Sequence, residues 1–115
     1  MRVIARGTLI GFVRNRVERK LQRVVKEHLD AWYAETAKAE WKSPAELKSQ
    51  FSSASIISDQ RVVFNIKGNA FRLIVSINYY YQVLFIKWIG SHKEYDKIDA
   101  ESVSYDESRY ADPSH

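Results

Sequence analysis

Eight side chains that can carry positive charge or exchange a proton lie between positions 61 and 97, near the ends of expected strands. They are Arg61, Lys67, Arg72, Lys87, His92, Lys93, Tyr95 and Lys97. Such groups can cleave RNA without a metal, because the 2′-hydroxyl beside the scissile phosphate is itself the nucleophile. The protein then has to orient that hydroxyl, remove its proton, stabilise the charged phosphorane and protonate the leaving oxygen.

Each of these side chains also has an ordinary structural explanation, and the sequence leaves both explanations open. His92 follows the end of a strand, where it could hydrogen-bond to the backbone instead of acting as an acid or base. Tyr95 could bury its ring against Trp88 and present only its hydroxyl to solvent. Arg72 lies within a strand, where solvent-facing arginines are common, and Lys67 could simply be a lysine at the tip of a hairpin.

Other types of functional site find little support in the sequence. The histidines His28, His92 and His115 are widely separated and lack a carboxylate pair at ligand spacing, so we expect neither a metal nor another cofactor. Gly68 stands alone rather than in a phosphate-binding loop. The chain has no cysteine, which excludes disulfides and thiol catalysis. No apolar run approaches the roughly 20 residues of a membrane helix, and no secretory signal is visible, so we expect a cytoplasmic protein without a membrane partner.

The charge distribution divides the chain into a basic body and an acidic tail. Residues 99–115 carry five acidic side chains and one arginine, whereas residues 1–98 carry 17 basic and 9 acidic side chains, a net charge of +8. We therefore expect one domain over residues 1–98 that suits a polyanion, followed by a mobile tail over residues 99–115. The tail either folds back over the basic site or is inert. Glu94 and Asp96 are expected to form part of the solvated surface.

The N-terminal part of the chain is expected to be helical after a short first strand. A helix should begin near Thr8, whose hydroxyl can cap it, and Gly11 and Asn15 favour a break, so we expect two helices. A short third helix over residues 44–51 should begin with a capping box led by Ser43. The second helix should bury a stripe at three- and four-residue spacing: Val17, Leu21, Val24, Val25, His28 and Trp32.

Alternating apolar and polar residues predict strands in the second half of the chain. A hairpin is expected over residues 61–75, where Gly68 and Asn69 tolerate the positive φ of a two-residue turn. A last strand over residues 84–89 should lead into a short helical turn within residues 92–99. This alternation packs one face of the sheet against a core and leaves the other face available for polar functional side chains. The chain is therefore expected to be an α+β protein, with N-terminal helices packed on a small antiparallel sheet.

Three segments, at residues 41–48, 61–75 and 92–96, read WKSPAELK, RVVFNIKGNAFRLIV and HKEYD. Their order and spacing resemble the HigB-type toxins of the RelE/ParE superfamily, which belong to bacterial type II toxin–antitoxin pairs. The resemblance covers residues 41–98 well and residues 1–40 loosely. It implies a compact, RelE-like single domain.

The resemblance also implies a function, an endoribonuclease (mRNA interferase) that cleaves translated messenger RNA on the ribosome. It implies a cognate, HigA-like antitoxin that carries a helix-turn-helix domain. The toxin itself would then contact DNA only indirectly, through this antitoxin. By position, His92 would be the acid or base, Tyr95 would position the substrate or donate a proton, and Arg72, supported by Lys67 or Lys93, would stabilise the phosphate. The basic residues expected to bind RNA are Arg61, Lys67, Lys87, Lys93 and Lys97.

Two other functions remain open at this point. ParE-like relatives share the fold but inhibit DNA gyrase by binding it, and such a protein would not need His92. A non-catalytic protein that binds RNA or the ribosome would show salt-dependent binding without cut products.

Overall fold

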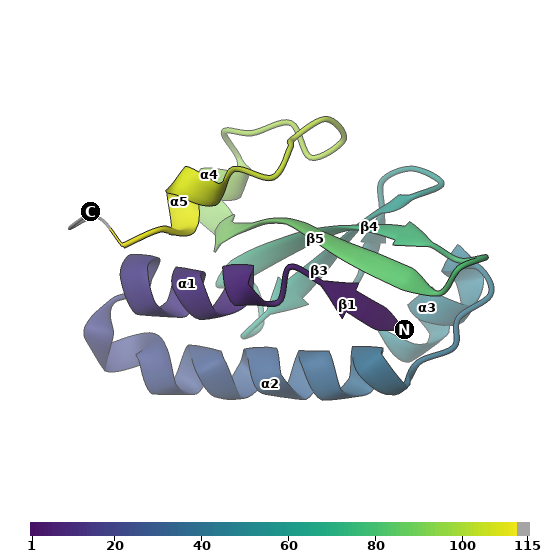
Figure 1. Cartoon of the computed structure of the whole chain (residues 1–115), viewed down its shortest axis with the longest axis horizontal. Helices are drawn as coiled ribbons and strands as arrows, with labels where there is room; N and C mark the ends of the chain where they lie inside the picture. The colour runs from purple at the N-terminus through teal and green to yellow at the C-terminus, as the bar shows by residue number, and fades with distance from the viewer. Residues whose placement is uncertain (113–115) are drawn as a thin grey trace.

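A five-stranded sheet forms one layer of the fold, and α1 and α2 cover one of its faces (Figure 1). The computed structural model describes residues 1–112. The strands are β1 (Arg2–Ile4), β2 (Ser55–Ile56), β3 (Arg61–Ile66), β4 (Phe71–Asn78) and β5 (Val83–Ser91). The helices are α1 (Gly7–Arg16), α2 (Gln22–Lys38), α3 (Pro44–Gln50), α4 (His92–Tyr95) and α5 (Glu107–Tyr110), with a 3-10 turn at Arg19–Leu21. The expected α+β fold is confirmed.

The sheet has the strand order β1-β5-β4-β3-β2, and one of its pairs is parallel. Strands β2 to β5 pair antiparallel with their neighbours, as expected. Strand β1 instead runs parallel to β5, with Arg2 opposite Val83. A parallel pair requires a long crossover connection. Here the crossover from β1 to β5 contains α1, α2, α3 and the strands β2 to β4.

The first helix begins close to its expected start but lacks the expected cap and the expected break at Gly11. Helix α1 begins at Gly7, and its N-cap residue Arg6 makes no side-chain capping bond. Thr8 is buried, so its hydroxyl is not the cap that the sequence predicted. Gly11 lies inside α1 rather than at a break, and the helix ends at Arg16. The prediction of two helices is nevertheless correct.

Helix α2 buries a stripe that only partly matches the predicted one. Val25 and Trp32 are buried as expected, but Val24 and His28 are exposed. Val24 and His28 form the row next to the buried one, and a rotation of about 100° per residue turns that row toward solvent. Of the two predicted residues before α2, Val17 is buried and Leu21 is partly buried. The buried row itself comprises Val25, Leu29, Trp32 and Thr36.

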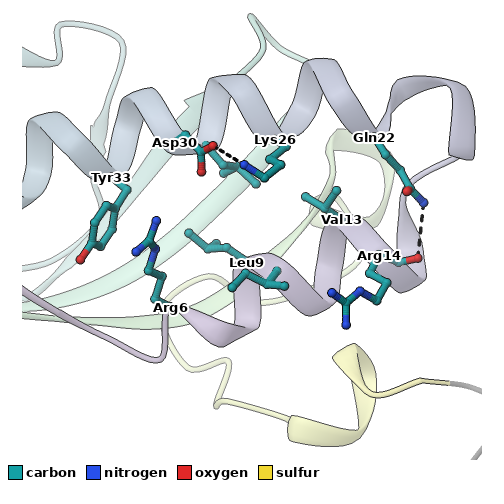
Figure 2. Close-up of a pocket in the computed structure, with 10 residues that line it drawn as sticks. Arg6, Leu9, Val13, Arg14, Gln22, Lys26, Asp30 and Tyr33 are labelled. Carbon is teal, nitrogen blue, oxygen red and sulfur yellow. Dashed lines mark hydrogen bonds and ion pairs between the residues drawn. The ribbon is translucent and has the colours of Figure 1, made fainter.

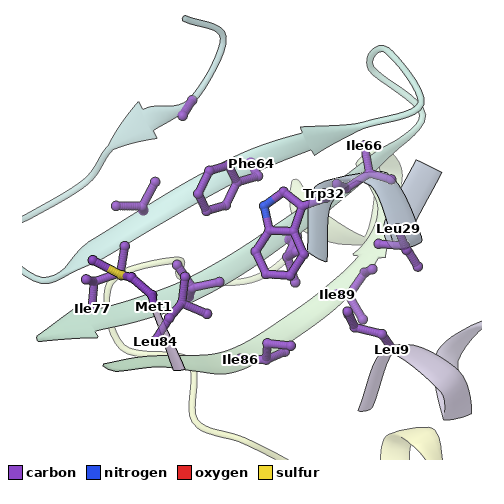
Figure 3. Packing of buried hydrophobic residues seen from close by; sticks show 14 of the residues in the cluster. Met1, Leu9, Leu29, Trp32, Phe64, Ile66, Ile77, Leu84, Ile86 and Ile89 are labelled. Atoms are coloured by element: carbon purple, nitrogen blue, oxygen red, sulfur yellow. The ribbon is translucent and has the colours of Figure 1, made fainter. Parts of the chain in front are cut away.

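The main core fills the space between the helices and the inner face of the sheet (Figure 3). Trp32 from α2 meets the ring of Phe64 on β3 edge-on, with ring centroids 5.4 Å apart. Phe51, just after α3, meets the same Phe64 ring at 5.1 Å. This aromatic cluster fixes β3, and β4 and β5 pair beyond it.

The β3–β4 hairpin is confirmed, but its turn is longer than expected. The paired residues end at Ile66 and Phe71, which leaves four residues in the turn. Positive φ falls on Lys67 (53°) and Gly68 (62°) rather than on Gly68 and Asn69. The Ala70 amide donates a hydrogen bond to the Lys67 carbonyl across the turn (3.1 Å).

Ser43 caps α3 as predicted, but the return bond of the expected capping box comes from the Lys42 amide instead of the Ser43 amide. The Ser43 hydroxyl accepts from the Glu46 amide (3.4 Å), and the Glu46 carboxylate accepts from the Lys42 amide (3.1 Å). We expect Ser43→Ala to lower the free energy of unfolding by about 1 kcal/mol, because a helix N-terminal amide loses its acceptor. Urea denaturation measures this loss. The control Ser52→Ala removes an exposed serine hydroxyl outside any helix; an equal loss in both variants would contradict the capping role.

Candidate functional site

The face of the sheet opposite α1 and α2, called the outer face here, carries the candidate site. Val63, Ile74 and Trp88 form its buried apolar patch. Residues that follow β5 pack against this patch, among them Tyr95, Ile98, Ala100 and Val103. Strand alternation places further side chains on the same face: Arg61, Asn65, Arg72, Ser76 and Phe85. Lys87, the extra residue at the irregular step of β5, extends over the ring of Phe85.

Arg72 is held in place and directed at Tyr95. Its guanidinium carbon lies 5.9 Å from the centroid of the Tyr95 ring. One guanidinium nitrogen, Nη1, donates to the carbonyls of Asn69 (3.0 Å) and Phe71 (3.4 Å). Within residues 1–112 the other guanidinium nitrogens make no hydrogen bond. Arg72 is therefore oriented by the β3–β4 turn and keeps N–H groups for an anion.

Helix α4 is a single turn that begins where β5 ends. The Ser91 hydroxyl accepts from the Glu94 amide (3.2 Å), while the Glu94 carboxylate accepts from the Ser91 amide (3.0 Å), a complete capping box. The His92 amide donates to the Ala70 carbonyl in the β3–β4 turn (3.1 Å). The same turn therefore holds both Arg72 and the start of α4.

His92 and Tyr95 lie three residues apart on this turn, which places them on neighbouring positions of one helical surface. His92 is exposed, and Tyr95 is half-buried with its ring 6.4 Å from that of Trp88. In the described part of the chain, neither the imidazole nor the phenol hydroxyl makes a hydrogen bond. Both groups are thus available to exchange a proton with a bound molecule.

Glu94, which the sequence placed on the solvated surface, is the most tightly held acidic group of the site. Burial alone raises the pKa of Glu94, but the Ser91 amide and the Arg16 and Arg109 guanidinium groups outweigh it and lower the pKa from 4.5 to about 2. The Arg16 bond is 3.0 Å long and the Arg109 bond 3.1 Å. The sequence did carry a signal, because Ser91 and Glu94 have capping-box spacing.

Because the pKa of Glu94 is lowered in the folded protein, its ionisation should affect the free energy of unfolding at acid pH. A carboxyl whose pKa is lower in the folded than in the unfolded chain stabilises the fold above its unfolded pKa, and this contribution is lost as pH falls. We expect wild type to lose stability between pH 4.5 and about 2 more steeply than Glu94→Gln does. Arg16 and Arg109 face this carboxyl from other elements, and His92 and Lys93 share its helix.

Urea denaturation at a series of pH values measures this difference. Glu107→Gln is the matched control, because Glu107 is exposed and makes no ion pair within residues 1–112. Parallel pH profiles for wild type and Glu94→Gln would contradict the role given to this carboxyl.

The predicted RNA-binding lysines are spread over α4, the residues just after it, β5 and the β3–β4 turn. Lys93 lies within α4, and Lys97 just after it; both are exposed. Lys87 lies at the irregular step of β5, 5.6 Å from the ring of Phe85. Lys67 lies in the β3–β4 turn and lines a hollow of about 160 Å³ on the side of α2.

Arg61 lies apart from the other predicted residues. It is four residues from Asn65, the partner of Arg72, which is about 13 Å along a strand. Its Nη1 donates to the carbonyls of Ala100 (3.1 Å) and Val103 (2.8 Å). The structure therefore gives Arg61 backbone partners within the protein.

Residues 99–112, which the sequence predicts to be a mobile tail, pack against the body of the protein in the structure. Tyr110 is only 5% exposed, and Arg109 forms an ion pair with Glu94. Of the two alternatives, the structure shows this segment folded back on the outer face and on α1. Residues 113–115, with His115, lie outside the described residues.

A second concave surface lies between α1 and α2 (Figure 2) and has a volume of about 410 Å³. Leu9 and Val13 contribute apolar side chains to it. Three of its charged residues have partners: Lys26 pairs with Asp30 at 2.6 Å, and the Arg6 guanidinium carbon lies 3.8 Å from the centroid of the Tyr33 ring. None of the predicted site residues lines this groove, so the candidate site remains the outer face with α4.

Two other properties of residues 1–112 bear on the sequence predictions. No group of three histidine, cysteine or acidic side chains converges there in a way that could hold a metal ion. No helix in the same part of the chain has the length and apolar character needed to cross a membrane.

Comparison with known proteins identifies the family of the chain. A family model described as HigB_toxin, RelE-like toxic component of a toxin–antitoxin system, matches residues 25–98. Curated relatives named mRNA interferase toxin HigB, from Escherichia coli (strain K12), and mRNA interferase HigB, from Shigella flexneri, are each 36% identical over 66 residues. That alignment covers 56% of this chain and 64% of each relative, so the chain spans less than two thirds of their length. The family match takes in Arg72, His92 and Tyr95, and it covers more than half of the chain. The chain therefore belongs to the HigB toxin family of RelE-like toxins.

Proposed function

We propose that this chain is the toxin of a type II toxin–antitoxin pair and acts as an endoribonuclease on translated messenger RNA in the cytoplasm. The observation that carries the proposal is the arrangement of Arg72 against Tyr95, one helical turn from His92. All three lie within the family match, and the relatives it resembles are named mRNA interferases. Together they provide an anion-binding group and two groups that can exchange protons.

In the proposed reaction the RNA 2′-hydroxyl attacks the adjacent phosphate without a metal. His92 removes the proton of the attacking hydroxyl, since histidine is the residue type best suited to proton transfer near neutral pH. The uncommitted N–H groups of Arg72 stabilise the charge on the phosphorane. Tyr95 positions the phosphate or donates a proton to the leaving 5′-oxygen. The products are a 2′,3′-cyclic phosphate and a 5′-hydroxyl end.

The surrounding lysines are proposed to hold the RNA backbone. Lys93 and Lys97 flank the reacting groups, Lys87 extends the cationic surface along β5, and Lys67 supports it from the hairpin turn. We assign Arg61 a smaller share in RNA binding, because two backbone carbonyls occupy one of its guanidinium nitrogens. Phosphate contacts of this kind make binding weaken as salt concentration rises.

The proposed partners follow from the family. A cognate, HigA-like antitoxin with a helix-turn-helix would neutralise the toxin, and DNA would be reached only through that antitoxin. The ribosome would present the message, which explains how a small basic surface could select translated RNA.

The experiment that tests this function maps the ends of a cleaved message. Wild-type protein is added to a purified translation system, and the expected cuts carry 2′,3′-cyclic phosphate and 5′-hydroxyl ends. A single 2′-deoxynucleotide at the mapped site should abolish the cut there, because the nucleophile is missing. Cuts that persist at the deoxy site would contradict 2′-hydroxyl attack. Uncut message with inhibited DNA supercoiling would favour the gyrase-directed alternative, and salt-dependent binding without cuts would favour a non-catalytic RNA-binding protein.

A further inference from the structure

Residues 99–112, called the C-terminal strap here, lie beyond the family match and are attached to the body beside α4. We propose that the strap takes part in the site: its Arg109, through Glu94, positions α4, the helix that carries His92 and that places Tyr95 beside Arg72. This inference rests on the proposed function and adds two positioning residues to it. Figure 1 shows α5, the helical end of the strap, beside α4 and above α1.

Tyr110 anchors the strap to β5. Its hydroxyl accepts from the Ile89 amide (2.8 Å) and donates to the Ile89 carbonyl (3.0 Å), so it satisfies both backbone groups of one residue. Its ring meets that of Phe12 at 6.4 Å, in the main core. Ile89 lies two residues before Ser91, the N-cap of α4. The anchor therefore acts directly at the base of α4.

Helix α1 has a matching surface for the strap. A Cβ at Gly11 would lie 2.6 Å from the Tyr110 carbonyl oxygen, closer than such atoms approach. The Asn15 side-chain amide donates to the same carbonyl (2.9 Å). Gly11 and Asn15, which the sequence suggested as helix breakers, instead receive the strap. This fit makes the folded-back position a specific one.

Arg109 connects the strap to α4. Its side chain is only 16% exposed, and its Nη2 donates to the Ile89 carbonyl (3.1 Å) and to Oε2 of Glu94 (3.1 Å). Its guanidinium carbon lies 4.8 Å from the centroid of the Trp88 ring. The space that it occupies exists because residue 90 is glycine: a Cβ there would collide with the Trp88 ring and the Arg109 guanidinium.

Glu94 is where three separate elements meet. Its carboxylate binds Arg109 of the strap, Arg16 at the end of α1, and the Ser91 amide at the end of β5. A single helical turn is unstable alone, so contacts of this kind must hold α4 in position. Loss of the charge on Glu94 would leave the cap but release both guanidinium groups.

The first residues of the strap, which include Ala100 and Val103, are bound to the outer face of the sheet. Arg61 donates to the carbonyls of Ala100 and Val103, and the side chains of these two residues pack on the Val63, Ile74 and Trp88 patch. The strap is therefore fixed at both ends, with α4 beside its second anchor. A segment held only to cover apolar surface would not require the partly buried ion pair between Arg109 and the helix that bears His92.

The test compares Glu94→Gln, Arg109→Ala and Arg109→Lys with wild type in the full chain. Glutamine retains the capping bond to Ser91 but loses the charge, and lysine keeps the charge of Arg109. We expect Glu94→Gln and Arg109→Ala to lower kcat for message cleavage roughly tenfold to a hundredfold with little change in KM, because a displaced catalytic group costs rate rather than binding. Arg109→Lys should recover part of the loss. Glu107→Gln, in α5 but without an ion pair within residues 1–112, should behave as wild type.

Hydrogen exchange of the Asp96 and Lys97 amides, which donate to carbonyls of α4, gives a readout that needs no activity. These amides should exchange faster in Glu94→Gln and Arg109→Ala, while amides of β4 keep their wild-type rates. Unchanged exchange at these amides would overturn the proposal whatever the cleavage rate. Faster exchange with unchanged kcat would overturn the positioning role. If wild type itself does not cut message, the proposed function fails and the catalytic role of the strap falls with it, whereas the exchange rates still report whether the strap orders α4.

Discussion

His92→Ala is expected to lower the rate constant of message cleavage by about 10²- to 10⁴-fold, the usual contribution of a positioned general acid or base. The imidazole is exposed and has no hydrogen-bond partner within residues 1–112, so its removal disturbs no internal contact. The His92 amide, which ties α4 to the β3–β4 turn, is unaffected by the substitution. The loss should therefore appear in kcat under single-turnover conditions, with wild-type thermal stability.

The matched control for this variant is His28→Ala. His28 is also an exposed histidine, but it lies on α2, on the side of the sheet away from Tyr95 and Arg72. It should cleave at the wild-type rate. Equal losses in the two variants, or a wild-type rate in His92→Ala, would remove His92 from the mechanism.

Arg72→Ala is expected to lower kcat by about 10²- to 10³-fold, the typical cost of removing one preorganised donor to a developing negative charge. Asn69 and Phe71 hold the guanidinium in advance, so the free N–H groups need no reorganisation when charge develops. Arg72→Lys should recover little of this activity. An ammonium group lacks the fork that binds two backbone carbonyls and a phosphate at once.

Rapid-quench kinetics on the same message measures both Arg72 variants. Arg19→Ala serves as control, because it removes one exposed positive charge from the 3-10 turn without breaking an ion pair within residues 1–112. If Arg19→Ala slowed cleavage as much as Arg72→Ala does, the effect would come from net charge rather than from a specific phosphate contact.

The parts of the fold that were predicted correctly from sequence depend on interactions between near neighbours. The cap of α3 requires only Ser43 and Glu46, three residues apart, and the β3–β4 hairpin requires alternation on either side of Gly68. The buried row of α2 was less predictable, because Val24 and Val25 are both apolar and only tertiary packing selects between their rows. The parallel pairing of β1 with β5 is likewise a long-range choice.

The candidate site likewise contains residues that could be predicted from sequence and contacts that could not. Arg72, His92 and Tyr95 could be named from residue type and resemblance, and the structure places Arg72 beside Tyr95. The ion pairs of Glu94 could not be predicted, because its partners Arg16 and Arg109 are 78 and 15 residues away in sequence. A tail rich in acidic residues also gives no sign that it will fold, since its anchoring depends on surfaces supplied by α1 and β5.

The proposed role of His92 in ribosome-dependent cleavage can be measured by mapping messenger RNA ends in a purified translation system, with and without ribosomes, for wild type and His92→Ala. Wild type is expected to cut translated message alone, and a folded His92→Ala protein is expected to leave it uncut. Intact message in every reaction, from a toxin that still blocks growth, would contradict this role.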